Sequence, residues 1–333
     1  MKTISTVIVS WNSGEDLIEC VASLARARRK SNFSPGRIEL VVIDNHSDAF
    51  PERRLREAWP DVRLAVLGEN VGFGPAANHG AAHARGDVLL FLNPDTRASG
   101  NPFPAIAEAF EAHADWIAVA PRLVEMAGPG EGGASRDEEK RRGVGGRDSQ
   151  EEFQLRRLPR LGGAVRELLL VDRLFPRNPG RRRDRYLDRD RESSFEVEQP
   201  AAAALAVRKS AFQRVGGFDP LFAPAWWEDV DLCRRLATEG KIFYVPSARF
   251  EHRGGRAMES LGYDRFLPLY YRNAISYWKK SAGGLAALAF RALLLAGMLI
   301  RLALLPFRRG DPRPKAESLR AYRSTLAVAV SRR

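Results

Sequence analysis

The chain has 333 residues, 44% of them hydrophobic and 28% charged, a composition that excludes an intrinsically disordered protein and is typical of one large or two modest globular cores. Lys and Arg number 53 against 41 Asp and Glu, so the net charge of +12 favours an anionic partner: a nucleotide, a nucleic acid or an anionic membrane surface. The only two cysteines, Cys20 and Cys233, exclude a disulfide framework, and we expect buried free thiols in a cytoplasmic protein.

The first half of the chain alternates apolar runs with helical patterns. Residues 1–11 lack the long apolar core and the cleavage site of a signal peptide, so they predict a first strand rather than export. Strands are expected at 4–11, 38–45, 62–68, 87–93 and 116–124, and helices at 12–27 and 75–86. Continuous apolar strands that alternate with helices indicate a parallel sheet covered on both faces.

The second half is less regular. Gly and charge dominate 126–152, which we predict to be a mobile loop, and 178–193 is predicted to be a second polar loop after a helical stretch at 161–176. An ordered segment is expected again at 197–219. A helix is expected over 228–240, with Gly240 as its C-cap, and a strand over 241–252.

The most apolar stretch of the chain is 283–309. Arg291 interrupts it, and the run between Arg291 and Arg301 is too short to span a bilayer. At roughly 100° per residue the two arginines fall about 80° apart, so they are expected to share one polar stripe of a helix that lies in the membrane interface. A buried helix packed on the main domain and a dimer contact are the alternatives.

Polar side chains follow three of the predicted strands. They are Ser10 and Asn12, Asp44 and Asn45, and Asn93 and Asp95. Because the carboxyl ends of parallel strands meet at one edge of a sheet, these groups are expected to converge there. The Asp44 carboxylate suits hydrogen bonds from a base N–H or ribose hydroxyls, and an N-cap for the next helix explains it equally well.

The turn Asn93-Pro94-Asp95-Thr96 stops a buried strand abruptly, because proline cannot continue the ladder. A short carboxylate on such a turn suits Mg²⁺ or Mn²⁺, which would neutralise a diphosphate; a turn that merely needs Asp is the simpler explanation. His252 is a plausible second metal ligand, although a lone histidine is more often structural.

A glycine-rich segment, GFGPAA at 72–77, formally satisfies the dinucleotide-binding pattern, with Asp95 about 20 residues further on. This would predict an NAD-dependent enzyme. The match is weak, because Glu69 and Asn70 separate the first glycine from its strand and Pro75 stands where the helix should begin.

The segment Trp226-Trp227-Glu228-Asp229 concentrates unusual residues before a helix. Acidic residues in a first helical turn are favoured by the helix dipole, which is sufficient to explain them. The two indoles also offer flat faces of the kind that stack on sugar rings, and crowding of like charges raises a carboxyl pKa towards that of a general base.

Six motifs in order resemble glycosyltransferase family 2, and within it the rhamnosyltransferase-like bacterial enzymes. They are TVIVSWNS, ELVVIDNHS, ENVGFGPAANHGAAHARGDVLLFLNPDT, VRKSAFQRVGGFDPLF, WWEDVDLCRRL and PSARFEHRGG, and together they cover roughly residues 3 to 258. The resemblance implies the GT-A fold, with a mostly parallel central sheet, helices on both faces and apolar helices at the C-terminus. It also implies a metal-dependent, hexosyltransferase-like enzyme that transfers a sugar from a nucleotide diphosphate donor with inversion.

The resemblance assigns roles residue by residue. Asp229 would be the catalytic base, and Asp95 and His252 would bind Mn²⁺ or Mg²⁺. The expected donor-binding residues are Ser10, Asn12, Asp44, Asn70, Gly72 and Asn93, and the acceptor-side candidates are Trp226, Trp227 and Glu228. The chain departs from the family at Asn93, where an aspartate is usual, and at Gln199, Ala201 and Ala202, where relatives often carry Trp, Ser and Gly.

The implied organisation has a nucleotide-sugar-binding half at 1–125, loops and a helical insertion at 126–196, an acceptor half at 197–258 and a helical, membrane-associated region at 259–333. The expected acceptor is a glycan or a lipid-linked glycan of cell-envelope polysaccharide biosynthesis, and rhamnose is the default sugar. The enzyme would then be cytoplasmic and peripheral on the inner face of the cell membrane. The alternative is a non-catalytic, membrane-associated nucleotide-binding relative. No nucleic-acid partner is expected, because the Arg-rich loops carry no recognisable reading motif.

Overall fold

The computed structural model describes residues 2–29, 35–126, 154–254, 261–308 and 313–331. The chain forms two compact units: unit 1 holds Met1–Glu138, Asp148–Arg157 and Arg189–Gly254, and unit 2 holds Glu139–Arg147, Leu158–Asp188 and Gly255–Arg333. Except for Met126, the loop predicted at 126–152 lies outside the described residues.

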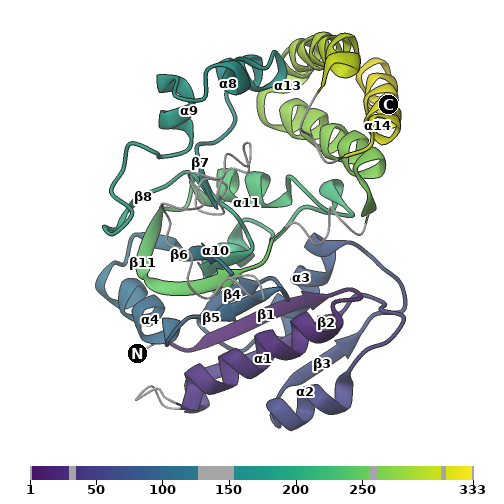
Figure 1. The fold of residues 1–333 in the computed structure, drawn as a ribbon. Coiled ribbons are helices and arrows are strands. Elements are labelled where there is room, and N and C mark those ends of the chain that lie inside the picture. The colour runs from purple at the N-terminus through teal and green to yellow at the C-terminus, as the bar shows by residue number, and fades with distance from the viewer. Residues whose placement is uncertain (1, 30–34, 127–153, 255–260, 309–312, 332–333) are drawn as a thin grey trace, which may run out of the picture. The chain divides into compact units, whose positions relative to one another are not determined.

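Unit 1 is built on a mixed nine-stranded sheet, as far as the structure describes it (Figure 1). Its main order is β3 (Arg63–Val66), β2 (Ile38–Asp44), β1 (Ile4–Ser10), β4 (Val88–Leu92), β10 (Ala204–Arg208), β6 (Trp116–Glu125), β11 (Lys241–His252) and β5 (Thr96–Ala98), with β8 (Phe195–Glu196) beside β11. A separate ladder joins β7 (Leu155–Arg156) to β9 (Gln199–Pro200). The first four strands are parallel, and β10 enters antiparallel between β4 and β6.

Helices cover both faces of the sheet, so β1 and β4 are buried at every position, and β4 is apolar throughout. On one face, Ile4 and Ile8 pack in the cluster formed with α1 (Gly14–Arg29) and α4 (Pro102–Ala112). On the other face, a Cβ on Gly80 of α3 (Phe73–His83) would stand 2.5 Å from Val7, so this glycine permits close approach of helix and sheet.

The predicted strands and the two buried free thiols are confirmed. Helix α2 (Glu52–Ala58), helix α4 and strand β5 were not predicted from the sequence. The expectation that the helix at 228 ends with Gly240 is wrong: α11 covers Glu228–Leu236, and its C-cap is Ala237. Gly240 instead lies where the chain enters β11, and a Cβ at this position would stand 2.6 Å from Asp115 O.

Unit 2 is helical. It contains α7 (Leu161–Leu168), α8 (Val171–Leu174), α9 (Pro179–Asp184), α13 (Tyr263–Leu304) and α14 (Lys315–Val330), and short 3₁₀ turns occur here at Leu305–Phe307 and in unit 1 at Pro35–Arg37 and Pro220–Phe222. The prediction that 178–193 is only a polar loop is therefore wrong, because the Asn178 side chain accepts a hydrogen bond from Arg181 N and caps α9.

Helix α13 is two helices joined at Gly283, whose φ of 86° and ψ of 177° are not helical. The second half packs back on the first, with the Phe290 ring 5.6 Å from that of Trp278 and 6.5 Å from that of Tyr271. Among the described residues, Tyr263–Phe307 is long and apolar enough to cross a membrane by length and composition alone.

The two arginines of this helix do not form the predicted open polar stripe. Arg291 Nη1 donates to the carbonyls of Val328, Ala329 and Ser331 at the end of α14. The Arg301 guanidinium donates to Leu168 O and Glu167 O at the end of α7. The last carbonyls of a helix lack intrahelical partners and carry the negative end of its dipole, so they attract a guanidinium more strongly than open solvent does.

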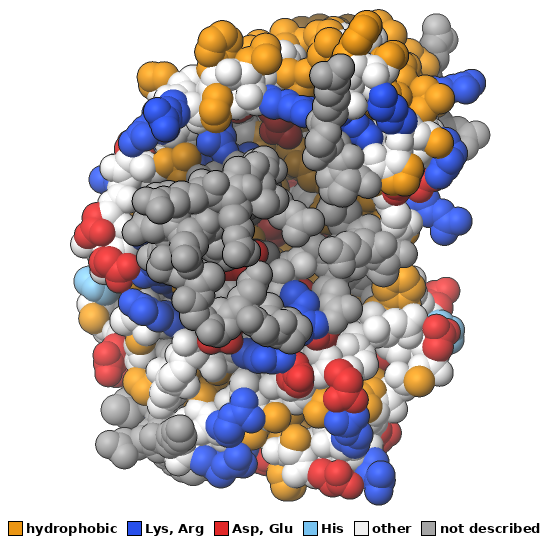
Figure 2. Space-filling view, in the orientation of Figure 1, with side chains coloured by type: hydrophobic (Ala, Val, Ile, Leu, Met, Phe, Trp, Pro, Cys, Tyr) orange, Lys and Arg blue, Asp and Glu red, His pale blue; other side chains and the backbone are white. Residues whose placement is uncertain are grey.

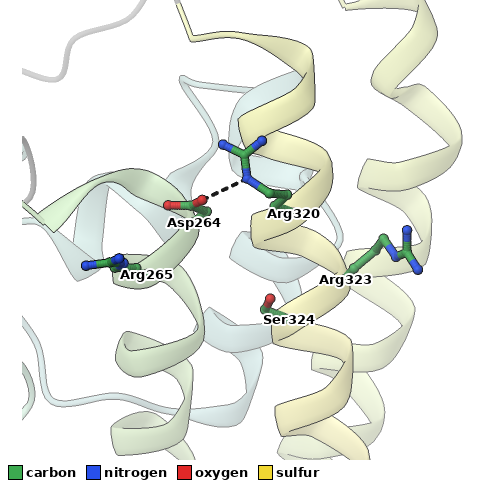
Figure 3. A pocket seen from close by; sticks show the side chains of 5 residues that line it. All are labelled: Asp264, Arg265, Arg320, Arg323 and Ser324. Carbon is green, nitrogen blue, oxygen red and sulfur yellow. Dashed lines mark hydrogen bonds and ion pairs between the residues drawn. The ribbon is translucent and has the colours of Figure 1, made fainter.

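Unit 2 also has a shallow hollow of about 380 Å³ between the first turn of α13 and α14 (Figure 3). Its lining residues are Asp264, Arg265, Arg320, Arg323 and Ser324, and Arg320 Nε donates to Asp264 Oδ2 at 2.9 Å. None of the predicted site residues lines it.

Candidate functional site

The carboxyl ends of β1 and β2 lie side by side, with Ser10 paired to Asp44 as predicted from the parallel sheet. Asp44 is 1% exposed, and its carboxylate accepts hydrogen bonds from Ser47 N (3.1 Å) and Ser47 Oγ (2.5 Å). The same hydroxyl oxygen accepts from Asn12 N, and Asn12 Nδ2 donates to Asp48 Oδ2. Asp44 therefore fixes the turn at 45–48. It does not cap the next helix, whose N-cap is Pro51.

The loop that contains Asn70 is tied to the end of β2. Asn70 Oδ1 accepts from Asn45 Nδ2 (2.9 Å) and from Gly72 N (3.0 Å), while Asn45 Oδ1 accepts from Val71 N. Gly72 has φ of 87°, and a Cβ there would lie 2.7 Å from Pro224 O. The loop is thus held against the segment that leads to the two tryptophans.

These contacts do not support the dinucleotide interpretation of GFGPAA. The helix predicted at 75–86 is confirmed as α3, which begins two residues earlier, at Phe73; Pro75 is tolerated in its first turn, where no intrahelical N–H bond is lost. However, Phe73 N donates to Pro224 O at 2.7 Å, and Gly74 lies against Phe218. The backbone that should approach a pyrophosphate is occupied by protein.

The turn after β4 brings two distant polar residues together. Thr96 N and Thr96 Oγ1 both donate to Asn93 O, which closes the turn at Asn93-Pro94-Asp95. Antiparallel pairing of β5 with β11 sets Thr96 opposite His252. As a result His252 Nε2 lies 3.3 Å from Asp95 Oδ1, and each side chain is 10% exposed.

The surroundings of Asp95 favour its ionised form. Burial by itself would raise its pKa, but the hydrogen bond and charge attraction of His252, together with backbone N–H groups, outweigh burial and hold the pKa below its ordinary value. Among the described residues, no group of three or more His, Cys, Asp or Glu side chains is arranged to enclose a metal. Asp95 and His252 therefore fit a cation that takes its remaining ligands from water and a substrate diphosphate, as Mg²⁺ does in phosphate sites.

The second cluster begins at two tryptophans in the left-handed region, with φ of 70° at Trp226 and 75° at Trp227. Such conformations cost about 1–3 kcal/mol each and occur mainly at functional sites. Trp227 is buried, at 7% exposed, so the expectation that both indoles offer faces to a sugar is wrong; of the two, Trp226 is the one that is partly exposed.

The two carboxylates that follow differ in their surroundings. Glu228 is buried, and its Oε2 has no hydrogen-bond partner among the described residues. Asp229 is partly exposed, and its carboxylate accepts from Val230 N (2.8 Å) and from Gln199 Nε2 (3.4 Å). Only Asp229 combines an ordered carboxylate with accessible surface.

Burial and the nearby charge of Asp229 raise the pKa of Glu228 well above its ordinary value. Burial also raises the pKa of Asp229, and the attraction of Arg156 and hydrogen bonds from backbone N–H groups, including that of Ala202, partly oppose this. Because the charge of Arg156 acts on Asp229, whereas for Glu228 only a backbone hydrogen bond opposes burial, we expect Glu228 to keep its proton to higher pH than Asp229 does.

The raised pKa of Glu228 predicts a pH-dependent loss of stability. Below its ordinary pKa of 4.5 the group is neutral in both states; as pH rises towards the folded-state pKa, only the unfolded chain releases the proton, which favours unfolding by about 1.4 kcal/mol per pH unit. Glu228→Gln cannot ionise, so its melting temperature should exceed that of the wild type by a margin that grows between pH 4.5 and pH 8. Parallel melting curves over this range would contradict the prediction.

One segment links the two clusters. Asn93 N donates to Ala203 O at 3.0 Å, the N–H of the preceding residue, Ala202, contributes to Asp229, and Gln199 donates to Asp229. The turn of Asp95 and the carboxylate of Asp229 are therefore positioned by the same segment, 199–203, within unit 1. Three of its residues, Gln199, Ala201 and Ala202, are positions at which the sequence departs from the family pattern.

Comparisons with known proteins identify the family of this chain. The model of glycosyl transferase family 2 matches residues 5–165. An N-acetylglucosaminyl-diphospho-decaprenol L-rhamnosyltransferase of Mycobacterium tuberculosis is 30% identical over 260 residues, which cover 75% of each chain. The chain belongs to glycosyltransferase family 2. A second relative of this family 2 chain, an uncharacterised glycosyltransferase of the same organism, is 34% identical over 110 residues, 33% of this chain and 39% of the relative.

Solved structures confirm the predicted GT-A fold. GalNAc-T7 with UDP, GalNAc and Mn²⁺ superposes with a TM-score of 0.56 at 16% identity, covering 98% of this chain and 54% of that one. A mannosyltransferase of Pyrobaculum calidifontis with GDP-Man and Mn²⁺ gives a TM-score of 0.52 at 14% identity, covering 98% and 84%. The family 2 chain is thus an α/β glycosyltransferase with a mixed sheet and apolar C-terminal helices.

Sequence reasoning missed two participants in the site. Ser47 holds Asp44, and its position three residues after a strand-ending aspartate is the one local signal for it, since Asp side chains close turns of this kind. The charge of Arg156 acts on Asp229. Pairing of β7 with β9 sets Arg156 opposite Gln199, and no local sequence pattern around Arg156 predicts this role.

Proposed function

We propose that this chain is an inverting glycosyltransferase that moves a sugar from a nucleotide diphosphate donor to a glycan or lipid-linked acceptor. Rhamnose is the sugar favoured by the M. tuberculosis relative, whose name states that it is an L-rhamnosyltransferase. The observation that carries the proposal is the Asp95–His252 pair, connected through residues 199–203 to the partly exposed residue Asp229.

In this proposal Asp229 is the general base. Its carboxylate accepts the proton of an acceptor hydroxyl, whose oxygen attacks the anomeric carbon while the bond to the nucleoside diphosphate breaks on the opposite face. Of the two tryptophans, the partly exposed Trp226 stands on the acceptor side with Glu228, whose buried surroundings favour the protonated form. Residues 197–258 thereby form the acceptor half.

The donor would lie along the carboxyl edge of the first half, 1–125. Asp44 acts by fixing the turn at 45–48, because its own oxygens are buried and engaged by Ser47. The Asn70–Gly72 loop shapes one wall. Ser10, Asn12 and Asn93 complete the edge.

A divalent metal, Mn²⁺ or Mg²⁺, is proposed as cofactor at Asp95 and His252. When bound it would neutralise the charge that develops on the departing diphosphate. The site carries carboxylates at positions 44, 95 and 229, so an anionic donor needs such a cation nearby. Two related folds were solved with Mn²⁺ and a nucleotide or nucleotide sugar.

The acceptor is proposed to be lipid-linked. The M. tuberculosis relative is named for a diphospho-decaprenol acceptor, and the present chain carries a long apolar helix in unit 2. We therefore place the enzyme in the cytoplasm, peripheral on the inner face of the cell membrane, in biosynthesis of cell-envelope polysaccharide.

The direct test is transfer from nucleoside-diphosphate rhamnose to a polyprenyl-diphosphate-linked N-acetylglucosamine in detergent, with product detected by mass. The expected product is heavier by one deoxyhexose and has inverted anomeric configuration. Binding of nucleotide diphosphates without turnover on any donor tested would instead support the non-catalytic relative. Retention of configuration would refute the single-displacement mechanism.

A further inference from the structure

The second half of α13 exposes one continuous apolar face. Leu285, Leu288, Ala292, Leu299 and Ala303 are all exposed. At roughly 100° per residue these five positions fall within about 60° of the helix circumference, and they span about 27 Å along its axis. None of them is charged or polar. We call these five residues the apolar stripe.

The opposite side of this helix is already used inside unit 2. Ala287, Phe290, Leu294 and Met298 are buried there. The arginines are tied to the ends of α14 and α7 and do not face outward with the stripe. The helix therefore has its arginine contacts on the protein side and Leu285, Leu288 and Leu299 on the outside, the reverse of a helix stabilised by water.

The exposure is large for side chains of this kind: 85% for Leu285, 63% for Leu288 and 52% for Leu299. Figure 2 shows apolar side chains gathered over the helices of unit 2, with Lys and Arg among them. Contiguous exposed apolar surface rimmed by charge marks an interaction site rather than an ordinary surface.

Positive charge stands at both ends of the stripe in the chain. Lys279 and Lys280, both exposed, precede Gly283, and Arg308 follows the helix. Residues 261–331 contain twelve Lys and Arg against three Asp and Glu. A basic, apolar surface complements the anionic inner leaflet, where each Lys or Arg near the surface adds to the attraction.

We propose that the apolar stripe is the surface by which this enzyme lies on an anionic lipid bilayer, with Leu285, Leu288 and Leu299 inserted at the boundary of headgroups and acyl chains. The inference rests on the proposed function, since a lipid-linked acceptor is reached from this interface. The helix lies in the plane of the membrane and does not cross the bilayer. Crossing would separate its buried side chains from the rest of unit 2 and break the hydrogen bonds of Arg291 and Arg301.

The test is flotation of the purified full chain with vesicles of phosphatidylcholine alone or mixed with phosphatidylglycerol. The wild type should bind the anionic vesicles and bind less as salt is raised. Leu285→Gln with Leu288→Gln should lower partitioning at least tenfold, since insertion of one leucine contributes about tenfold. Both positions are exposed, so folding should be unchanged.

Two further variants locate the effect. Val66→Gln, at a 60% exposed apolar position of β3 in unit 1, is the matched control and should leave partitioning unchanged. Arg291→Gln should lower the melting temperature, through loss of its bonds to α14, while the folded fraction still floats. Loss of flotation by folded Arg291→Gln would show that this arginine faces the lipid and would overturn the proposed orientation.

Other outcomes also overturn the inference. Unchanged flotation of the double leucine variant would exclude the stripe as the lipid contact. If the wild type is a dimer in solution and the double variant is a monomer, the stripe is a contact between two copies. Protein that resists extraction by alkaline carbonate would be integral. Activity on a water-soluble acceptor analogue separates the two proposals. If the double leucine variant keeps this activity but does not float, the stripe is confirmed as the lipid contact independently of catalysis. If the wild type floats but shows no turnover, only the proposed function is refuted.

Discussion

Asp229→Asn is expected to lower the turnover of sugar transfer by about 10²–10⁴-fold, which is the usual contribution of a general base. The asparagine is nearly isosteric and can still bond with Gln199 and Val230, so the local structure should be kept. What is lost is the capacity to take the acceptor proton. The measurement is the rate constant for transfer at saturating donor and acceptor.

The neighbouring carboxyl group supplies a matched control. Glu228 is expected to be neutral near pH 7, because burial and the charge of Asp229 raise its pKa, so Glu228→Gln changes little in charge or shape. Its turnover should stay within about tenfold of the wild type, well short of the loss expected of a general base. The donor affinity of Asp229→Asn should be unchanged. Full turnover in Asp229→Asn, or equal losses in both variants, would refute Asp229 as the base.

Asp95→Ala should abolish metal-dependent stabilisation by the donor. A ligand at about 100 times its dissociation constant adds roughly 2.7 kcal/mol to the free energy of unfolding. The wild type should show such a gain with one nucleotide sugar in the presence of Mn²⁺ and a smaller gain without it. In Asp95→Ala the two gains should become equal, because His252 alone offers the cation a single protein ligand.

The control for Asp95 is Asp115→Ala. Asp115 is an exposed carboxylate that pairs with Lys241 at 2.9 Å and belongs to none of the site segments. Its removal deletes the same charge from unit 1 and should leave the response to Mn²⁺ and donor unchanged. If donor stabilisation in the wild type does not depend on metal, Asp95 and His252 form a structural pair and the proposed metal site is wrong.

Much of the fold could be predicted because its signals are local. The buried strands β1, β2, β4 and β6 carried apolar runs, and the Asn93-Pro94 step after Leu92 marked where a strand ends. Helix α4 (Pro102–Ala112) was not predicted because Pro102 and Pro104 stand in its first turn, and proline usually marks a turn or loop. Strand β5 has three residues, too few for any period to be detected.

The site could be predicted only as a set of residue types. The motifs indicated which carboxylates matter, but His252 is 157 positions from Asp95, and pairing of β5 with β11 brings the two within 3.3 Å. Likewise, the sequence contains two adjacent tryptophans, and the backbone conformation at 226 and 227 determines that Trp227 is buried.

The sequence by itself determined the apolar strands, the carboxylates at their ends and the family. Tertiary structure alone decided that Arg291 and Arg301 bind the ends of α14 and α7, and that leucines therefore face outward. A helical wheel states which residues share a side of a helix. It does not state which side meets protein, because that depends on the free energy of contacts with segments far away in the chain.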